Sequence, residues 1–270
     1  MGIKFNSIQA RLLTGFSILI FLIIALSGIL FYYYSRLQNI NKIEYGAEKL
    51  MVSAMQMMAS DEQFILNDIQ NIEFFEKQNN YYIDHRDSLF SGINSQIYQY
   101  QQDFDHKDIV NSFSRILLAL DSYHDTYMQV LDAYQKRGFI DYGVEGEMRD
   151  LVHALEDSTE LNFKKEWVLT FRRHEKDYIL RKDDYYVTKF NDYYKSLSNR
   201  LSGKPEYKAG LEILSAYRTK FLEMVELEKK IGLHQNDGLR GKLFDKKVEC
   251  LDEFQVLGNR VIKLSKEVNE

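Results

Sequence analysis

The stretch Leu12–Ser35 reads LLTGFSILIFLIIALSGILFYYYS and contains no charged side chain. Its 24 residues are enough for a helix to cross the hydrocarbon core of a bilayer. A cleaved signal peptide has an apolar core of only about 7–15 residues followed by small residues, whereas aromatic residues follow here. We therefore predict a retained transmembrane helix over 12–35, in preference to a removed signal or a buried core helix. Lys4 and Arg11 favour a cytoplasmic segment 1–11, which places residues 36–270 in the periplasm or outside the cell.

The composition of the remaining chain favours helices and excludes several classes of protein. The net charge is −5 and no basic stripe is present, so we expect no nucleic-acid partner. The one cysteine, Cys250, rules out an internal disulfide framework and a site with several cysteine ligands. The one proline, Pro205, leaves long stretches free to form uninterrupted helices. We expect the 19 tyrosines and 17 phenylalanines to form the core and rim of helical bundles.

Apolar periodicity and helix-breaking residues divide the chain into helical segments, and no strand-like alternation of useful length is visible. The fold class is therefore all-α. The predicted segments run from the membrane to about residue 66, and then over 73–100, 107–137, 147–181, 185–201, 206–231 and 242–270.

An internal repeat predicts the domain organisation. The pattern Tyr123-x3-Tyr127…Gly138…Gly143-x2-Gly146 returns as Tyr217-x3-Phe221…Gly232…Gly238-x2-Gly241, and the segment 61–67 resembles 175–181. The two copies cover about 55–148 and 168–243. Each copy is too small to bury its apolar faces alone, so we expect two stacked four-helix-bundle modules. The glycines are expected to permit positive φ or close backbone approach at turns.

The segment 171–181, FRRHEKDYILR, is the densest polar cluster on an apolar-periodic helix. At 100° per residue, Arg172, Glu175 and Lys176 share the arc that holds Leu161, Val168 and Ile179. Charges on a core-facing arc must be paired or liganded. Arg172 and Lys176 could bind a carboxylate, because arginine offers a planar bidentate fork. Alternatively, Glu175 and an acid of another helix neutralise both. Three further charges, Arg173, Asp177 and Arg181, form a separate solvated stripe with i,i+4 spacing.

Catalytic and metal-binding motifs are not recognisable in the sequence. His153 is expected to be a hydrogen-bonded packing residue rather than a ligand contact. The Asp121/His124 and Asp150/His153 pairs do not meet the Glu-x-x-His pattern of di-iron bundles. No nucleophile elbow, P-loop, zinc-protease motif or dinucleotide fingerprint is present. We predict neither an enzyme nor a bound metal or cofactor.

Two motifs resemble a known family. RRHEKDYILR at 172–181 and G-x-x-GEMR-x-x-VH-x-x-E at 143–156 are similar to motifs in extracytoplasmic sensor regions of bacterial methyl-accepting chemotaxis receptors, specifically the helical bimodular sensor domain. The resemblance covers residue 36 to the C-terminus. It implies two helical modules that bind small organic acids, with Arg172 or Arg173 as the anchor and His174, Lys176 and Tyr178 beside it. The corresponding stretch of the first copy, 57–62, has no basic residue, which argues against an anionic ligand there.

From these features we predict a sensor region of a receptor in the bacterial inner membrane that binds a small organic acid and forms a homodimer. The alternative is a membrane-anchored helical scaffold that binds another protein and no metabolite. The resemblance also leads us to expect a second membrane span and an output domain, which do not follow residue 270. The chain would then be either the N-terminal piece of a larger receptor or a receptor without its output.

Overall fold

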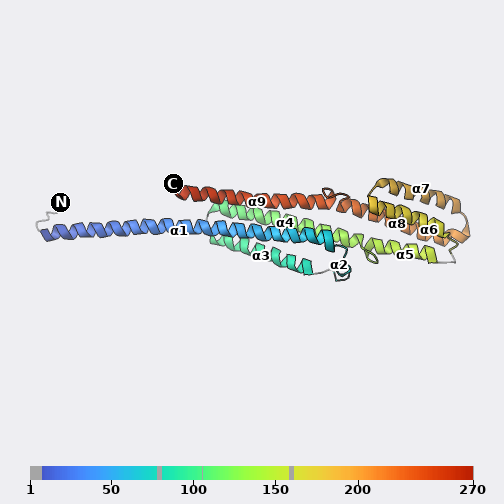
Figure 1. The fold of residues 1–270 in the computed structure, drawn as a ribbon, viewed down its shortest axis with the longest axis horizontal. Helices are drawn as coiled ribbons and strands as arrows, with labels where there is room; N and C mark the ends of the chain where they lie inside the picture. Colours follow the sequence, from blue (N-terminus) through green and yellow to red (C-terminus); the bar gives the residue numbers. More distant parts are fainter. Residues whose placement is uncertain (1–7, 78–80, 105, 158–160, 270) are drawn as a thin grey trace.

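The computed structural model describes residues 8–77, 81–104, 106–157 and 161–269. Within these residues every regular element is a helix and no strand occurs, which confirms the all-α prediction. The molecule is elongated, with the N-terminal part of the first helix projecting from one end (Figure 1).

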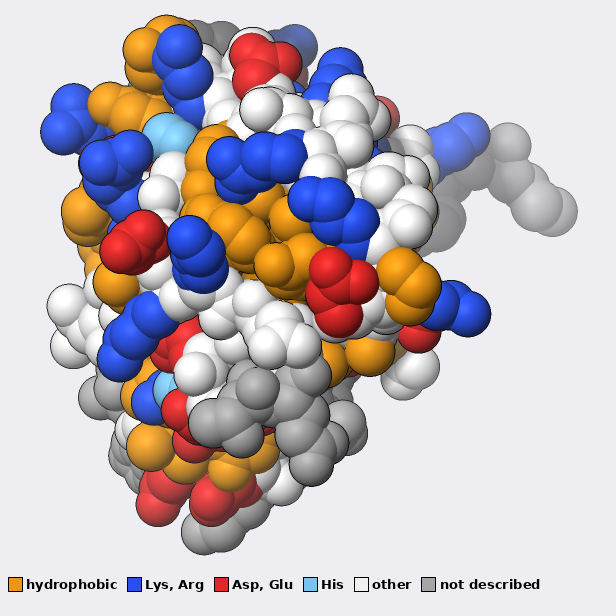
Figure 2. All heavy atoms as spheres, turned by 90° about the vertical axis from the view of Figure 1, so that its right-hand side faces the viewer, with side chains coloured by type: hydrophobic (Ala, Val, Ile, Leu, Met, Phe, Trp, Pro, Cys, Tyr) orange, Lys and Arg blue, Asp and Glu red, His pale blue; other side chains and the backbone are white. Residues whose placement is uncertain are grey.

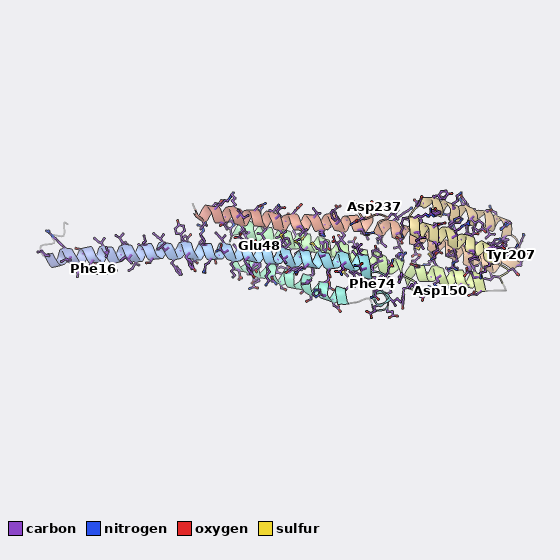
Figure 3. The ribbon with its side chains drawn as sticks, in the orientation of Figure 1. Phe16, Glu48, Phe74, Asp150, Tyr207 and Asp237 are labelled. Carbon is purple, nitrogen blue, oxygen red and sulfur yellow. The ribbon has the colours of Figure 1, made fainter. Side chains whose placement is uncertain are left out.

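The first helix, α1, runs from Ile8 to Gln63 without interruption and is 56 residues long. One turn of π-helix, Phe64–Asp68, follows it directly. The apolar side chains of its N-terminal part are exposed, and Phe16 points outward from a segment that no other helix covers (Figure 3). This part of α1 is long and apolar enough to cross a membrane.

The other helices follow in short succession, and the bounds of most agree with the predicted segments. Two predictions were wrong. The expected single helix 73–100 is two helices, Ile72–Lys77 and Tyr81–Asp103. The expected single helix 147–181 is also two helices, with Asn162 between them at a φ of 52°. The break lets the second helix reverse direction, and it removes Leu161 from the helical face to which we had assigned it. The remaining elements are α2 Ile72–Lys77, α3 Tyr81–Asp103, α4 Lys107–Arg137, α5 Gly143–Asp157, α6 Lys165–Arg181, α7 Asp184–Leu201, a 3₁₀ turn Pro205–Tyr207, α8 Lys208–Ile231 and α9 Gly238–Asn269.

The buried apolar side chains form two separate cores. The first core lies among α1, α3, α4 and α9, and includes Leu50, Phe113, Leu120 and Leu257. The second core lies among α5, α6, α7 and α8 at the other end of the molecule (Figure 1), and includes Phe171, Phe190, Leu214 and Phe221. The helices are amphipathic, so each set buries its apolar stripes by packing against the others.

Glycine-containing turns connect the two sets of helices. Gly138 (φ 82°) and Gly143 (φ 60°) join α4 to α5, and Gly232 (φ 121°) and Gly238 (φ 56°) join α8 to α9. Residues that carry a Cβ atom rarely adopt these positive φ values. The sequence repeat thus corresponds to a repeated helix–turn–helix unit, in which α4 packs against α9 as α8 packs against α5.

The two turns lie side by side, since Gly138 and Gly232 line one cavity. Ion pairs join the turn regions across the molecule. Arg137 Nε donates to Glu228 Oε1 at 3.0 Å, and Lys182 Nζ lies 2.7 Å from the same oxygen. Glu228 is largely buried, so the two cations offset the cost of removing its charge from water.

Aromatic side chains close the second core at the far end of the molecule, where Figure 3 places Tyr207. Trp167 packs edge-on against Phe163, and the Arg200 guanidinium lies 5.1 Å from the Trp167 ring centroid. Viewed from this end, Lys and Arg side chains surround an apolar patch (Figure 2). Cation–π contacts of this kind cover the aromatic surface while keeping the charges in water.

Candidate functional site

Helix α6 carries all five side chains that the sequence singled out, but it presents them differently from the prediction. Its buried positions are Val168, Phe171, Glu175 and Tyr178, which repeat at helical spacing. Arg172 and Lys176 lie at the edge of this buried stripe, with side chains 39% and 54% exposed. Of the three charges placed on the inward arc, only Glu175 is therefore within the core.

Glu175 is held by one hydrogen bond and one ion pair. Tyr217 of α8 donates its hydroxyl hydrogen to the Glu175 carboxylate, and Lys176 Nζ lies 2.7 Å from Glu175 Oε1. Burial, followed by the Glu175 charge, raises the pKa of the Tyr217 hydroxyl well above its ordinary value, so the phenol remains a donor. The buried carboxylate is thus neutralised by a cation at the rim of the core.

Arg172 forms an ion pair with α5. Its Nη1 lies 3.0 and 3.2 Å from the two carboxylate oxygens of Glu156. Glu156 is only 10% exposed, so the pair joins α5 to α6 beside the second core. The alternative that acids neutralise Arg172 and Lys176 is therefore what the structure shows.

A cavity nevertheless remains next to these cations. It has a volume of about 280 Å³ and lies between α5 and α6. Three cations, Arg149, Arg172 and Lys176, contribute to its wall, with His153 beside them. The other lining residues are Ile140, Glu145, Val152 and Glu175. His153 is not the packing residue that its sequence context predicts, because its side chain is half-exposed and lines this cavity.

The other three predicted residues do not line the cavity. Arg173 is exposed on the opposite side of α6. Tyr178 is fully buried and packs edge-on against Phe221, with burial raising the pKa of its hydroxyl. His174 is partly buried, and desolvation together with the Arg173 charge lowers the pKa of its ring. Of the five predicted ligand-binding residues, Arg172 and Lys176 therefore line the cavity, together with Arg149 and His153 from α5.

The first core contains a buried charge cluster that was not predicted from periodicity. Arg86 of α3 and Asp61 of α1 are each 1% exposed, and Arg86 Nε lies 3.3 Å from Asp61 Oδ1. Arg86 Nη1 contacts His124 Nδ1 and lies 3.2 Å from Asp87 Oδ1. The Arg86 guanidinium also lies 4.8 Å from the Tyr127 ring centroid. Arg86 is three residues after buried Ile83 and seven before buried Ile93, so helical spacing alone could have placed it in the core.

The cluster has a counterpart in the second core. Asp61 and Glu175 are equivalent in the sequence repeat, and both are buried beside repeat-equivalent tyrosines, Tyr123 and Tyr217. The cation that forms the ion pair comes from a different place in each core. Asp61 pairs with Arg86 of another helix, α3, whereas Glu175 pairs with Lys176 of its own helix, α6. The stretch 57–62 has no basic residue, and the cation that contacts Asp61 comes instead from another helix, α3.

We predict that Asp61 makes stability depend on pH. Burial outweighs the attraction of Arg86 and raises the pKa of Asp61 from 3.8 to about 6. The folded chain therefore binds this proton more tightly than the unfolded chain. The contribution of Asp61 to the free energy of unfolding is largest below pH about 4 and is lost as the pH rises through about 6, a change of about 3 kcal/mol. Denaturant unfolding of wild type and Asp61→Asn should show their stability difference changing by this amount between about pH 3 and about pH 8, a range that brackets both pKa values. A difference independent of pH would contradict the assignment.

Comparison with known proteins identifies no relative: no family model, no curated protein and no solved structure matches the chain. No group of three or more His, Cys, Asp or Glu side chains suited to a metal ion occurs in the described part of the chain.

Proposed function

We propose that the chain is the sensor region of a bacterial transmembrane receptor and binds a small organic acid in the cavity between α5 and α6. The observation that carries the proposal is the set of three cations, Arg149, Arg172 and Lys176, around about 280 Å³ of space. A carboxylate entering this space would exchange one acidic partner of these cations for another. Charge-assisted hydrogen bonds from arginine are among the stronger interactions available to it.

The arrangement of the helices supports a signalling role. In this proposal residues 12–35 of α1 cross the inner membrane, and residues 36–270 form two stacked four-helix-bundle modules in the periplasm. The end of α9 lies alongside α1, close to the projecting part of that helix (Figure 1). A ligand that favours one packing of the second module could therefore shift α9 toward or away from the membrane.

We further propose that the receptor is a homodimer. Apolar side chains that no other helix covers remain on α1 and α9 outside the membrane stretch, among them Tyr45, Val52, Phe244 and Val248. Such side chains on long amphipathic helices are suited to burial against a second copy of the chain.

The proposal predicts that Arg172→Ala weakens binding of a small dicarboxylate. We suggest titrating the full chain, in detergent, with succinate and following heat by calorimetry. Loss of a charged hydrogen-bond donor should weaken binding about 10- to 100-fold. Arg173→Ala is the matched control, because Arg173 is adjacent in sequence but lies outside the cavity. An equal effect of both variants, or no binding of succinate or other small carboxylates, would count against the proposal.

One observation favours the alternative of a membrane-anchored scaffold. Arg172 and Lys176 each already contact an acid, Glu156 and Glu175, at 3.0 and 2.7 Å. A ligand must compete with these pairs, whereas a purely structural role requires nothing further. If Arg172→Ala lowers the melting temperature while carboxylates bind neither protein, the ion pairs are structural and the scaffold is the better interpretation.

A further inference from the structure

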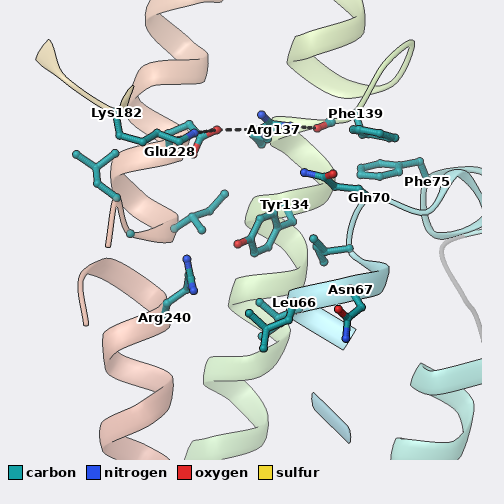
Figure 4. A pocket seen from close by; sticks show the side chains of 16 residues that line it. Leu66, Asn67, Gln70, Phe75, Tyr134, Arg137, Phe139, Lys182, Glu228 and Arg240 are labelled. Atoms are coloured by element: carbon teal, nitrogen blue, oxygen red, sulfur yellow. Dashed lines mark hydrogen bonds and ion pairs between the residues drawn. The ribbon is translucent and has the colours of Figure 1, made fainter. Parts of the chain in front are cut away.

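A second cavity lies at the junction between the two cores, outside the site proposed above. It has a volume of about 320 Å³. Its wall combines the π turn after α1, helix α2, and the two glycine turns at Gly138 and Gly232 (Figure 4). The lining residues come from positions 65–75, 134–139, 182 and 228–240, so four parts of the sequence meet around one space.

The charges around this junction cavity are unequal. Arg137, Lys182 and Arg240 line it, and Glu228 is the one lining acid among the described residues. Arg137 and Lys182 both contact Glu228, and Arg137 Nη1 also lies 2.7 Å from Glu145 Oε2. These four groups form a closed network with two charges of each sign.

Arg240 stands outside that network. No acid lies within ion-pair distance of its guanidinium among the side chains that the structure describes. Arg240 and Tyr134 point toward each other across the cavity (Figure 4), and the Arg240 charge acts on the Tyr134 hydroxyl. Burial nevertheless raises the pKa of that hydroxyl, so Tyr134 is a neutral phenol that can donate a hydrogen bond. One unpaired cation and one donor thus face the same space.

The rest of the wall is largely apolar. The rings of Phe75 and Phe139 stack with centroids 6.2 Å apart and planes 27° apart. Further apolar lining residues are Ile65, Leu66, Ile69, Ile231 and Leu233, and the amides of Asn67 and Gln70 lie in the same wall. By contrast, the apolar lining of the cavity between α5 and α6 is limited to Ile140 and Val152. The junction cavity therefore suits a ligand with a larger apolar body.

The π turn is a local feature of the same wall. Its residues Ile65, Leu66 and Asn67 all line the cavity. A π turn widens the helix and gives up regular i→i−4 bonds, so it persists where other interactions favour the shifted register, frequently at functional sites. Here it directs the end of α1 toward the glycine turns.

We propose that the junction cavity binds an organic monoanion with an apolar body, represented by an aromatic carboxylate. The carboxylate is held by Arg240 with the Tyr134 hydroxyl, and the ring lies against Phe75 and Phe139. This site is independent of the proposed function, because it shares no lining residue with the cavity between α5 and α6. Its ligand contacts both glycine turns and the end of α1, so occupancy changes the packing of the two cores against each other.

The test is a calorimetric titration of the full chain in detergent with benzoate. Benzoate should bind the wild type, and Arg240→Gln should weaken binding at least about tenfold through loss of a charged donor. Leu233→Trp, which fills the cavity and leaves every charge in place, should also weaken binding. Lys247→Gln is the control, because Lys247 lies two turns further along α9 and pairs with Glu62. Thermal unfolding of each variant establishes that it is folded.

Two outcomes with the wild type and the junction variants overturn the proposal: no heat of benzoate binding by the wild type up to about 10 mM, or undiminished binding by both folded variants, Arg240→Gln and Leu233→Trp. The result is separable from that of the proposed function through Arg172→Ala. That variant should keep benzoate binding while losing succinate binding. Loss of benzoate binding in Arg172→Ala alone would place both ligands between α5 and α6 and remove the junction site.

Discussion

Arg86→Met is expected to lower the free energy of unfolding by about 3–5 kcal/mol at pH 7. The substitution keeps much of the side-chain volume but removes the cation that, among the described residues, contacts buried Asp61. It also removes the hydrogen bond to His124 and the contacts with the rings of Tyr127 and Phe90. The His124 ring can accept from Arg86 because burial, followed by the Arg86 charge, lowers its pKa and favours the neutral form. Denaturant unfolding of the full chain in detergent, followed by circular dichroism, measures the loss.

The double variant Asp61→Asn/Arg86→Met separates the charge effect from the packing effect. Replacing both members of a buried pair with neutral groups is often nearly neutral, so most of the lost stability should return. The loss in Arg86→Met should also be smaller at pH about 4, where the Asp61 carboxyl is protonated in both proteins. A loss below about 1 kcal/mol at pH 7 would show that Arg86 is not the buried counter-ion that we describe.

Gly138→Ala and Gly232→Ala are each expected to cost at least about 3 kcal/mol. Both glycines have positive φ, 82° and 121°, at which alanine is strained. A Cβ added at Gly138 would also overlap the carbonyl oxygen of Tyr142, and a Cβ added at Gly232 would overlap the carbonyl oxygen of Asp237. Backbone atoms of a tight turn cannot move aside cheaply, so strain and overlap add. Thermal unfolding of the two variants measures the effect.

Gly258→Ala is the matched control for these variants. Gly258 lies within α9, and nothing lies within 4 Å of the position that a Cβ would occupy. Alanine in a helix interior is favoured over glycine by about 0.5–1 kcal/mol, so this variant should be slightly more stable than wild type. If Gly138→Ala and Gly232→Ala matched the control, the turns between the cores would not need left-handed backbone.

Much of the fold could be predicted because its determinants are local. The near absence of proline and the apolar periodicity predicted helices, and α4 begins and ends where the pattern placed it, at Lys107 and Arg137. The repeated glycines predicted two equivalent turns, and both have positive φ. The break between α5 and α6 was missed because the apolar spacing continues through it. The local feature that indicates this break is Asn162, because asparagine tolerates the left-handed backbone found there.

The candidate site was predicted only in part. Periodicity placed Arg172, Glu175 and Lys176 on the inward arc of α6, but only Glu175 is buried there. Periodicity also could not show which acid would meet Arg172. That acid is Glu156 of α5, which reaches Arg172 only because the chain reverses between the two helices. Arg149 and His153 join the cavity for the same reason.

The sequence by itself determined the helical class, the long apolar helix at the N-terminus and the repeated helix–turn–helix unit. These features depend on backbone propensity, side-chain period and the φ values open to glycine, each of which acts within a few residues. Only the tertiary structure decided that Arg86 meets Asp61 and that two glycine turns and a π turn enclose one cavity. Ion pairing and cavity formation depend on which distant segments come together, because the cost of burying a charge is set by the partners that the fold brings to it.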